Sequence, residues 1–279
     1  MNLVFPHCML ICMKAAIVSD IHANLEALQA VVEDARGRNF ASFLCLGDVV
    51  GYGADPNACV RTLRDLRAVA IMGNHDEGVV GGHANGFNCL AGIALEWTRS
   101  RISHSTAEWL ASCHYTMDLG DAVLCHGTLA NPKAFNYLIF ADAIAAHFVN
   151  QDKPLAFVGH THVPACYHAY PEAGEIQTVS GFGMGETIEV DPSDGTYWVF
   201  NVGSVGRPRD LCRNARYATI EGPERGPYRI TLREVEYDAE AAARKIREAG
   251  LPVKLADSLL PRPRPNVKNT GKGNVEKNS

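Results

Sequence analysis

Residues 14–36 read KAAIVSDIHANLEALQAVVEDAR, and this stretch decides the fold. Residues 15–18 form a short apolar run, which is typical of a buried strand. Residues 24–36 carry apolar side chains at helical spacing, at Leu25, Leu28, Val31 and Val32. A strand followed at once by a helix predicts a βα unit, in which the polar residues between them stand at the carboxyl end of the strand.

The same unit recurs along the first half of the chain. Residues 43–46 predict a second strand, and Asp55-Pro56 predicts an N-cap with proline at the first position of a helix that ends near Leu66. Alternation of this kind builds a mostly parallel sheet covered by helices. The other elements predicted here are a strand over 68–72, helices over 91–101, 105–112 and 141–149, and strands over 122–125 and 155–158.

The second half of the chain is rich in strand signals. Residues 228–233 alternate apolar and polar side chains as in a half-buried strand, and Glu234 breaks the phase, so a bulge there would let Val235 and Tyr237 resume it. Residues 239–249 predict a last helix. Short segments between Gly and Pro turns predict further strands over 167–170, 175–179, 186–190, 197–202 and 217–220.

Composition and charge exclude several classes of protein. The 279 residues include 26 Lys and Arg against 31 Asp and Glu, and a net charge of −5 does not suit a protein that binds nucleic acid through bulk charge. Hydrophobic residues make up 47% of the chain, enough for a sizeable core. The length allows one large domain or two small ones. We expect one domain over 13–261, an upstream extension over 1–12 and a disordered tail over 262–279.

The expected location is the cytoplasm. No apolar run approaches the ~18 residues of a membrane span, and residues 1–13 lack the basic residues and the cleavage site of a signal peptide. The nine cysteines are an odd number and form no C-x-x-C pair, as expected of thiols in a reducing compartment. We therefore expect no membrane partner.

Polar side chains of the kinds that bind metals follow directly after five predicted strands. Because the carboxyl ends of parallel strands line one crevice, these side chains should converge. Asp-x-His and His-x-His place two donors at i and i+2 of an extended segment, where both point the same way. The candidate ligands are Asp20, His22, Asp48, Asn74, His126, His160 and His162.

The donor types indicate which ions fit. Mixed oxygen and nitrogen donors without thiolate suit Mn²⁺, Fe or Zn²⁺ better than Ca²⁺ or a Cys-rich structural zinc. Seven ligands are too many for one ion, and they fill two sites if one carboxylate bridges, for which we favour Asp48. Two ions ~3.5–4 Å apart are suited to in-line displacement at phosphorus.

The strand-end blocks resemble the five-block signature of the calcineurin-like metallophosphoesterases. The segments 51–53, 94–99 and 201–210 are similar to a bacterial and archaeal branch of predicted phosphodiesterases, so the resemblance covers residues 14–260. It implies an α/β fold, a four-layer αββα sandwich of two mixed β-sheets face to face with helices outside. The blocks are Asp20-x-His22, Gly47-Asp48, Gly73-Asn74-His75-Asp76, His126 and Gly159-His160-Thr161-His162.

The resemblance also implies a role for each block residue. His75 would contact the phosphate without binding metal and protonate the leaving oxygen, and Asp76 would orient it. A hydroxide held between two divalent ions would be the nucleophile. Mn²⁺ is the expected ion, with Fe, Zn²⁺ and Ni²⁺ as alternatives. The implied ligands are Asp20, His22 and His162 for one ion, Asn74, His126 and His160 for the other, and Asp48 as the bridge.

Departures from the family pattern narrow the expected activity. Val49-Val50 stand near the place where protein Ser/Thr phosphatases carry an Asp-Arg pair that binds phosphate, and Val202 stands where the similar branch has Pro. We therefore expect hydrolysis of phosphodiesters or small phosphomonoesters. A protein phosphatase and a non-catalytic scaffold on the same fold are the alternatives, and the complete ligand set with His75 argues against the scaffold.

Two weaker signals concern the substrate, which we expect to be a small phosphoester. Four arginines lie within ten residues, and they suit either a solvated turn or a phosphate clamp, in which Arg207 and Arg209 would take part. Tyr52, between two glycines, suits either stacking on a substrate base or anchoring its loop. The other two arginines are Arg213 and Arg216. The sequence leaves the oligomeric state open.

Overall fold

The first of two β-sheets begins with the predicted βα units. The computed structural model describes residues 12–83, 86–170, 175–178, 183–210 and 213–260. In this sheet the order is β3-β2-β1-β11-β12-β9, with β1, β2 and β3 parallel and the other pairs antiparallel. The strands are β1 (Cys12–Val18), β2 (Ser42–Cys45), β3 (Val69–Ala70), β9 (Thr187–Val190), β11 (Ala215–Pro223) and β12 (Tyr228–Val235).

The second sheet has the order β4-β5-β6-β10-β7-β8. Its central strands β5, β6 and β10 are parallel to one another, while β4, β7 and β8 are antiparallel to their neighbours. Both sheets are therefore mixed. The strands are β4 (Thr116–Leu119), β5 (Ala122–Cys125), β6 (Leu155–Val158), β7 (Ala165–Tyr170), β8 (Glu175–Thr178) and β10 (Tyr197–Asn201).

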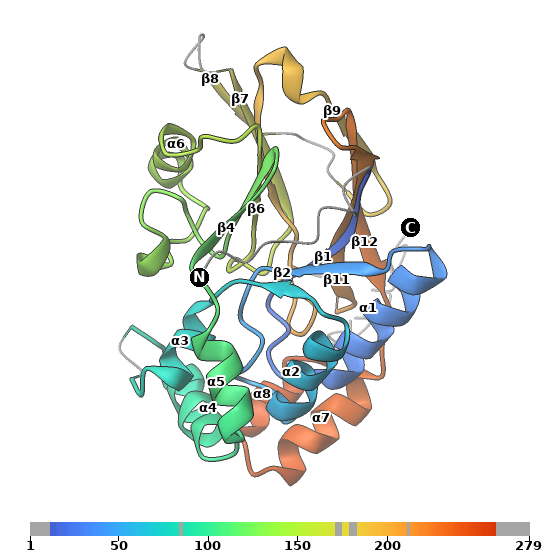
Figure 1. The fold of residues 1–279 in the computed structure, drawn as a ribbon. Coiled ribbons are helices and arrows are strands. Elements are labelled where there is room, and N and C mark those ends of the chain that lie inside the picture. Colours follow the sequence, from blue (N-terminus) through green and yellow to red (C-terminus); the bar gives the residue numbers. More distant parts are fainter. Residues whose placement is uncertain (1–11, 84–85, 171–174, 179–182, 211–212, 261–279) are drawn as a thin grey trace, which may run out of the picture.

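The two sheets pack face to face, with helices on the outer faces (Figure 1). Between the sheets lies a core to which Ile17 and Leu46 contribute from the first sheet and Phe157 and Phe200 from the second. The predicted αββα sandwich is confirmed. The helices are α1 (Leu25–Gly37), α2 (Pro56–Asp65), α3 (Asn74–Val80), α4 (Cys89–Arg99), α5 (His104–Ala111), α6 (Ala141–Val149), α7 (Ala239–Glu248) and α8 (Val253–Asp257), with short 3₁₀ turns at Pro132–Ala134 and Pro192–Asp194.

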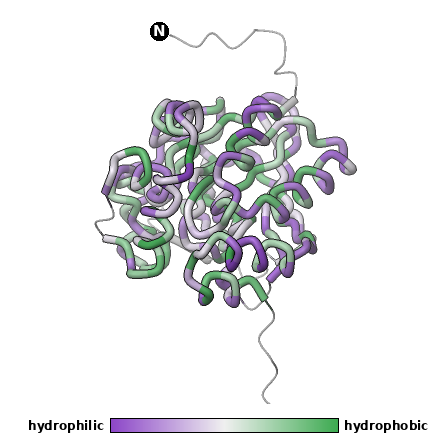
Figure 2. The backbone as a smooth tube through the Cα atoms, turned by 90° about the horizontal axis from the view of Figure 1, so that it is seen from below, coloured by the Kyte–Doolittle hydropathy of each residue, from purple (hydrophilic) through white to green (hydrophobic). Residues whose placement is uncertain are grey.

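Helix α1 shows why the sequence forms these layers. Asn24 caps it by accepting a hydrogen bond from the backbone N–H of Ala27. The apolar positions form one buried face that packs on the first sheet, and apolar and polar residues alternate along the helical turns of the chain (Figure 2). That face consists of Ala27, Leu28, Val31, Val32 and Ala35.

One of two local predictions is confirmed and the other is wrong. Asp55 stands at the N-cap of α2 and Pro56 opens the helix, as predicted, although the Asp55 side chain forms an ion pair with Lys245, 2.8 Å away, and makes no capping hydrogen bond. No bulge occurs at Glu234, because β12 pairs residue by residue with β11 as far as Val235. The Glu234 carboxylate pairs with Arg216, which explains a polar residue in that phase.

Other differences concern short elements and the bounds of the domain. The short elements β4, α3 and α8 were not predicted, and β1 begins at Cys12, one residue before the expected domain start. Almost all of the expected extension, residues 1–11, lies outside the described residues, and so does the expected tail over 262–279.

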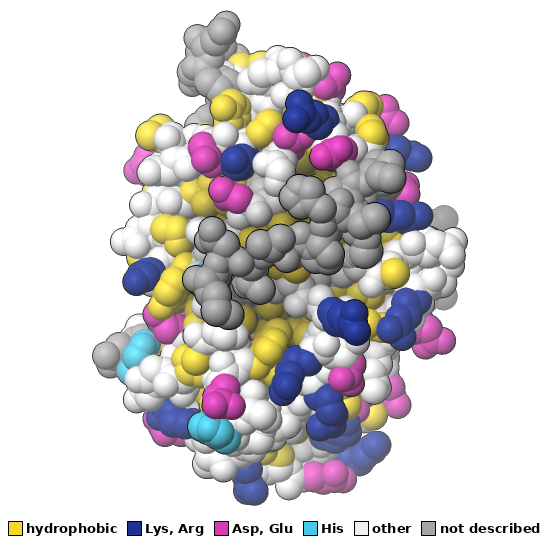
Figure 3. Space-filling view, viewed as in Figure 1, with side chains coloured by type: hydrophobic (Ala, Val, Ile, Leu, Met, Phe, Trp, Pro, Cys, Tyr) yellow, Lys and Arg dark blue, Asp and Glu magenta, His cyan; other side chains and the backbone are white. Residues whose placement is uncertain are grey.

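Surface charge agrees with the small net charge. On the face in Figure 3, Lys and Arg side chains lie among Asp and Glu side chains. Within the described part of the chain, no helix is both long enough and apolar enough to cross a membrane.

Candidate metal centre

Backbone hydrogen bonds continue beyond the strand ends and bring the strand-end blocks of the sequence together. The N–H of Asp20 donates to Gly47 O at 3.0 Å, and the N–H of His22 donates to Asp48 O at 2.9 Å. The Gly159 N–H likewise donates to His126 O at 3.0 Å. Each pair of loops therefore keeps the register of its strands, and the side chains that follow point into one crevice.

The glycines before the ligand residues are required by close packing. A Cβ at Gly73 would overlap the backbone of Asp48. A Cβ at Gly159 would overlap Ser19 Oγ, and it would lie 2.8 Å from Ser19 Cβ and 2.6 Å from Asp20 Oδ2. Any side chain at these positions would push the two ligand loops apart.

Gly159→Ala should therefore destabilise the fold by ~1–3 kcal/mol, as overpacking of a close-packed interior does, and weaken metal binding. Differential scanning calorimetry and a Mn²⁺ titration measure the two effects. Gly37→Ala is the matched control, because a Cβ at that helix end meets no atom within 4 Å and should leave both values unchanged or slightly raise stability. Equal melting temperatures and Mn²⁺ affinities for the two variants would contradict the packing argument.

Ligand residues adopt backbone conformations that L-residues rarely use. The φ angles of Asp20, His22 and Asp48 are 52°, 51° and 54°, and those of His160 and His162 are 66° and 61°. Such left-handed conformations cost of order 1–3 kcal/mol each in non-glycine residues and persist only where the surroundings impose them. Their concentration at one place indicates a functional site.

Two buried residues that sequence reasoning missed hold these loops. The Asn201 side-chain amide donates to Gly159 O at 2.7 Å and to Thr161 Oγ1 at 2.9 Å. The Ser204 hydroxyl donates to Asp20 O at 2.8 Å. Both residues belong to the 201–210 segment, whose resemblance to the family was the only sequence signal for them.

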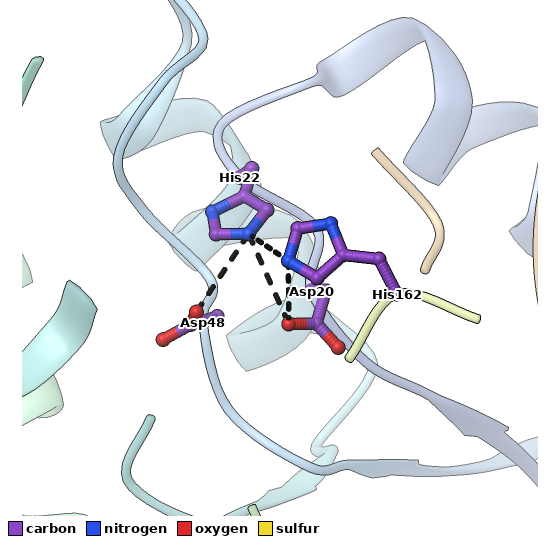
Figure 4. A group of neighbouring side chains, drawn as sticks. All are labelled: Asp20, His22, Asp48 and His162. Atoms are coloured by element: carbon purple, nitrogen blue, oxygen red, sulfur yellow. Dashed lines mark hydrogen bonds and ion pairs between the residues drawn. The ribbon is translucent and has the colours of Figure 1, made fainter. Parts of the chain in front are cut away.

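One group of four side chains consists of Asp20, His22, Asp48 and His162 (Figure 4). Their ligand atoms lie within 4.8 Å of one another, and all four residues are buried. His162 Nε2 is 3.2 Å from Asp20 Oδ1, and His22 Nε2 is 3.6 Å from Asp48 Oδ2.

The tautomers of the two histidines in this group suit a cation. Each Nδ1 faces a backbone carbonyl, Val50 O for His22 at 3.2 Å and Arg207 O for His162 at 2.6 Å. Each Nδ1 must therefore carry a hydrogen and donate it, which leaves a lone pair on each Nε2. The two Nε2 atoms are 3.1 Å apart. Two lone pairs at that distance repel each other, so either a proton on one Nε2 or a cation shared with the carboxylates relieves the contact.

A second group shares Asp48 with the first and adds His126 and His160. His126 Nδ1 donates to Leu46 O at 2.6 Å, and its Nε2 faces two acceptors, Asp48 Oδ2 at 3.4 Å and Asn74 Oδ1 at 3.2 Å, which a proton on Nε2 satisfies in the metal-free protein. This arrangement again suits a cation. Six of the seven candidate ligands thus lie in two groups that share Asp48, and the seventh, Asn74, lies beside His126.

The charge of Asp48 and Asp20 dominates the electrostatics. Burial opposes ionisation of Asp48, but neighbouring histidines outweigh it and lower the pKa of that carboxyl well below its usual range. Burial alone would lower the pKa of His126, but the charges of Asp48 and Asp20 outweigh this effect and raise the pKa to about 9. The carboxylates therefore attract positive charge, which a divalent ion would supply while displacing the proton of His126.

His75 lies beside both groups without joining either. Its ring is 3% exposed and contacts the rings of Tyr52, His22 and Phe87 at centroid distances of 4.5, 4.7 and 4.9 Å. Its backbone N–H, not its ring, donates to Asp48 Oδ1 at 2.8 Å. Burial lowers the pKa of His75 to about 4. Within the described residues its Nδ1 is buried beside Gly51 and has no hydrogen-bond partner.

Asp76 does not orient His75 through a direct hydrogen bond. Its carboxylate accepts hydrogen bonds from the backbone N–H groups of Val50 at 3.1 Å and Gly73 at 3.2 Å, and burial raises its pKa to about 7. Asp76 fixes the loops on either side of His75, so any orienting effect passes through the backbone.

The predicted substrate residues differ in exposure. The Tyr52 ring is 4% exposed, with the Arg207 guanidinium 4.1 Å from its centroid. That geometry favours the loop-anchor alternative for Tyr52, because no ring face is free for a base. Arg207 is partly buried and Arg209 is exposed. The backbones of these two arginines hold His162, through Arg207 O and the Arg209 N–H.

The remaining two arginines of the cluster serve the structure. Arg213 donates to Ser258 O at 2.7 Å. Arg216 is 4% exposed and pairs with Asp210 and Glu234. The four arginines therefore do not form one phosphate clamp, and only Arg207 and Arg209 remain beside the centre.

Comparisons with known proteins agree with this geometry. A model of the calcineurin-like phosphoesterase superfamily domain matches residues 13–222. An uncharacterized protein of Methanocaldococcus jannaschii is 35% identical over 250 residues, which make up 88% of this chain and 96% of that protein.

Solved structures share the fold. A metallophosphoesterase from Sphaerobacter thermophilus aligns with a TM-score of 0.74 and 36% identity, over 88% of this chain and 98% of that one. A hypothetical protein from Pyrococcus horikoshii aligns with a TM-score of 0.67 and 18% identity, over 88% and 97% of the two chains. With its fold, its paired ligand groups and this match over most of its length, the chain belongs to the calcineurin-like phosphoesterase superfamily, whose members are hydrolases of phosphoester bonds.

Proposed function

We propose that the protein hydrolyses phosphodiesters or small phosphomonoesters at a centre of two divalent metal ions. The observation that carries the proposal is the pair of buried ligand groups that share Asp48. Mn²⁺ is the proposed ion, because mixed carboxylate, amide and imidazole donors without thiolate suit it, and Fe, Zn²⁺ and Ni²⁺ are the alternatives.

Two divalent ions held by these groups would activate water and neutralise the charge of the phosphate oxygens. The chain itself fixes the ligands, excludes water from them and places the His75 imidazole beside Asp48. His75 contacts a phosphate oxygen and delivers a proton to the leaving oxygen. A bound phosphate, being anionic, raises the pKa of His75 from its low value in the free protein and so favours the protonated form.

The local structure supports a diester over a phosphoprotein. At Val49-Val50 the backbone is engaged in loop contacts, with Val50 N–H bound to Asp76 and Val50 O bound to His22. No guanidinium stands at this point of the chain, so a dianionic monoester lacks the extra anchor that protein phosphatases have. A monoanionic diester needs less positive charge and requires protonation of its leaving group.

We place the protein in the cytoplasm. The described cysteines are free thiols, and Cys45, Cys59, Cys125 and Cys166 are buried. Burial raises the pKa of the Cys45 and Cys59 thiols well above the usual range, so these residues behave as small apolar side chains.

Steady-state kinetics on three substrates test the proposal. With Mn²⁺ present, we expect an aryl phosphodiester to be hydrolysed at a kcat/KM comparable to or above that of the matching aryl monoester, and a phosphoserine peptide to be hydrolysed least. Asp48→Asn protein from the same purification controls for contaminating hydrolases. Fastest turnover of the phosphopeptide would establish the protein-phosphatase alternative, and no hydrolysis with any of the four metals would favour a scaffold.

A further inference from the structure

The loop between the second ligand group and α6 carries an exposed aromatic residue at the centre. Phe135 and Leu138 point inward, with exposed fractions of 8% and 2%. Between them Tyr137 is 41% exposed. A Cβ at Gly127 would lie 2.8 Å from Asn136 O, so the loop is packed tightly against the segment that follows His126. This anchoring gives Tyr137 a fixed position.

Tyr137 contacts the second ligand group. Its ring stacks on that of His160, with a centroid distance of 3.9 Å and an interplanar angle of 21°. Arg209 approaches the same loop, where its N–H donates to His162 O at 3.2 Å. The Tyr137 ring therefore lies at the edge of the candidate metal centre, against the loop that carries His160 and His162.

The surroundings of Tyr137 differ from those of Tyr52. Tyr52 is enclosed by Arg207 and two histidines. Tyr137 is covered on one face of its ring, and the rest of the side chain is exposed. Ile139 and Phe140 continue the same loop with exposed fractions of 54% and 72%. Exposed apolar side chains beside a site for phosphate are expected where the ligand itself carries an apolar group.

We propose that Tyr137 is a specificity-determining residue, on whose exposed ring surface the aromatic group of a substrate stacks. The preferred substrates are then phosphoesters that carry a planar ring, such as a nucleobase or an aryl group, in place of a plain sugar or alkyl phosphate. This inference rests on the proposed function, because it assumes that phosphate binds at the metal centre. Stacking suits a tyrosine whose opposite ring face already lies on an imidazole, since the ring is then held in one orientation.

Binding of two matched ligands tests the role of Tyr137 without catalysis. Adenosine 5′-monophosphate and ribose 5-phosphate carry the same phosphate and sugar and differ in the base, so the ratio of their Kd values isolates the ring. Isothermal titration of the Mn²⁺-loaded His75→Ala protein, in which hydrolysis is slow and the metal is retained, should give a ratio of roughly tenfold in favour of the nucleotide, within the range of base stacking on aromatic side chains. In the same background, Tyr137→Leu should bring the ratio close to one, and Tyr137→Phe should keep most of it.

Tyr170→Leu is the matched control, because Tyr170 is 42% exposed at the end of β7 and should leave the ratio unchanged. A ratio near one with Tyr137 in place, a ratio that survives in Tyr137→Leu, or binding of neither ligand would overturn the assignment. The proposed function fails separately: a protein with the expected ratio that hydrolyses no phosphoester retains the ring-binding role of Tyr137 and loses the enzymatic one. A protein that hydrolyses phosphoesters but has a ratio near one retains the enzymatic role and loses the ring-binding role of Tyr137.

Discussion

Asp48→Asn is expected to lose both metal ions and to reduce hydrolysis by more than about 100-fold, since changes even to residues behind metal ligands cost 10–100-fold. Asp48 belongs to both ligand groups, so an amide at this position removes one negative charge and one anionic ligand from each. Asn is isosteric, and its carbonyl oxygen can still accept the hydrogen bond from the His75 N–H. Elemental analysis of the purified variant and a Mn²⁺ titration measure the loss.

Asp76→Asn is the control for this change. Asp76 is as buried as Asp48, at 1% exposed, and lies 28 residues further along the chain, but belongs to neither ligand group. The Asp76→Asn protein should therefore retain its metal. Two full equivalents in Asp48→Asn, or the same loss in Asp76→Asn, would show that Asp48 does not bridge.

His75→Ala is expected to lower turnover by ~10²–10⁴-fold, the usual contribution of a general acid, with the metal content unchanged. The metal content should survive because the contact of His75 with Asp48 is made by the backbone N–H, which alanine keeps. Good leaving groups need little protonation, so the loss should shrink along a series of aryl diesters as the pKa of the leaving phenol falls. Rates with metal content determined on the same samples measure both effects.

Phe87→Leu controls for packing around His75. Phe87 contacts the His75 ring edge-on, and its replacement disturbs the neighbourhood while keeping the imidazole. Its effect should be small and independent of the leaving group. An equal loss in His75→Ala on good and poor leaving groups would leave His75 as an electrostatic contact and remove its role as an acid.

Local sequence patterns predicted many of the strands and helices, and the places of the candidate ligands at the strand ends. The β1–α1 unit and the helix α6 follow from runs of apolar residues, because a strand and a helix each impose their own period on neighbouring residues. The places of the candidate ligands were predictable for the same reason, since most of them stand directly after a strand. Whether those ligands bind metal is a prediction that the proposed experiments address.

Long-range partners were not predictable. Asp55 is the predicted N-cap residue of α2, but the partner of its carboxylate is Lys245, 190 residues away. Glu234 looked out of phase until Arg216 on the neighbouring strand supplied its partner. Asn201 bonds a loop 40 residues earlier in the chain, and nothing in its local sequence reports that contact. A single sequence shows periodicity, whereas these pairings depend on which strands become neighbours.

The left-handed backbone at the ligand residues has a consequence for how the centre assembles. The hydrogen bonds of Asn201 and Ser204, and the close approach at Gly159, impose those conformations from within the protein. Packing of the sheets during folding therefore supplies energy that bends the loops. A centre that the protein has shaped in advance in this way would leave the choice among similar divalent ions to their abundance in the cell.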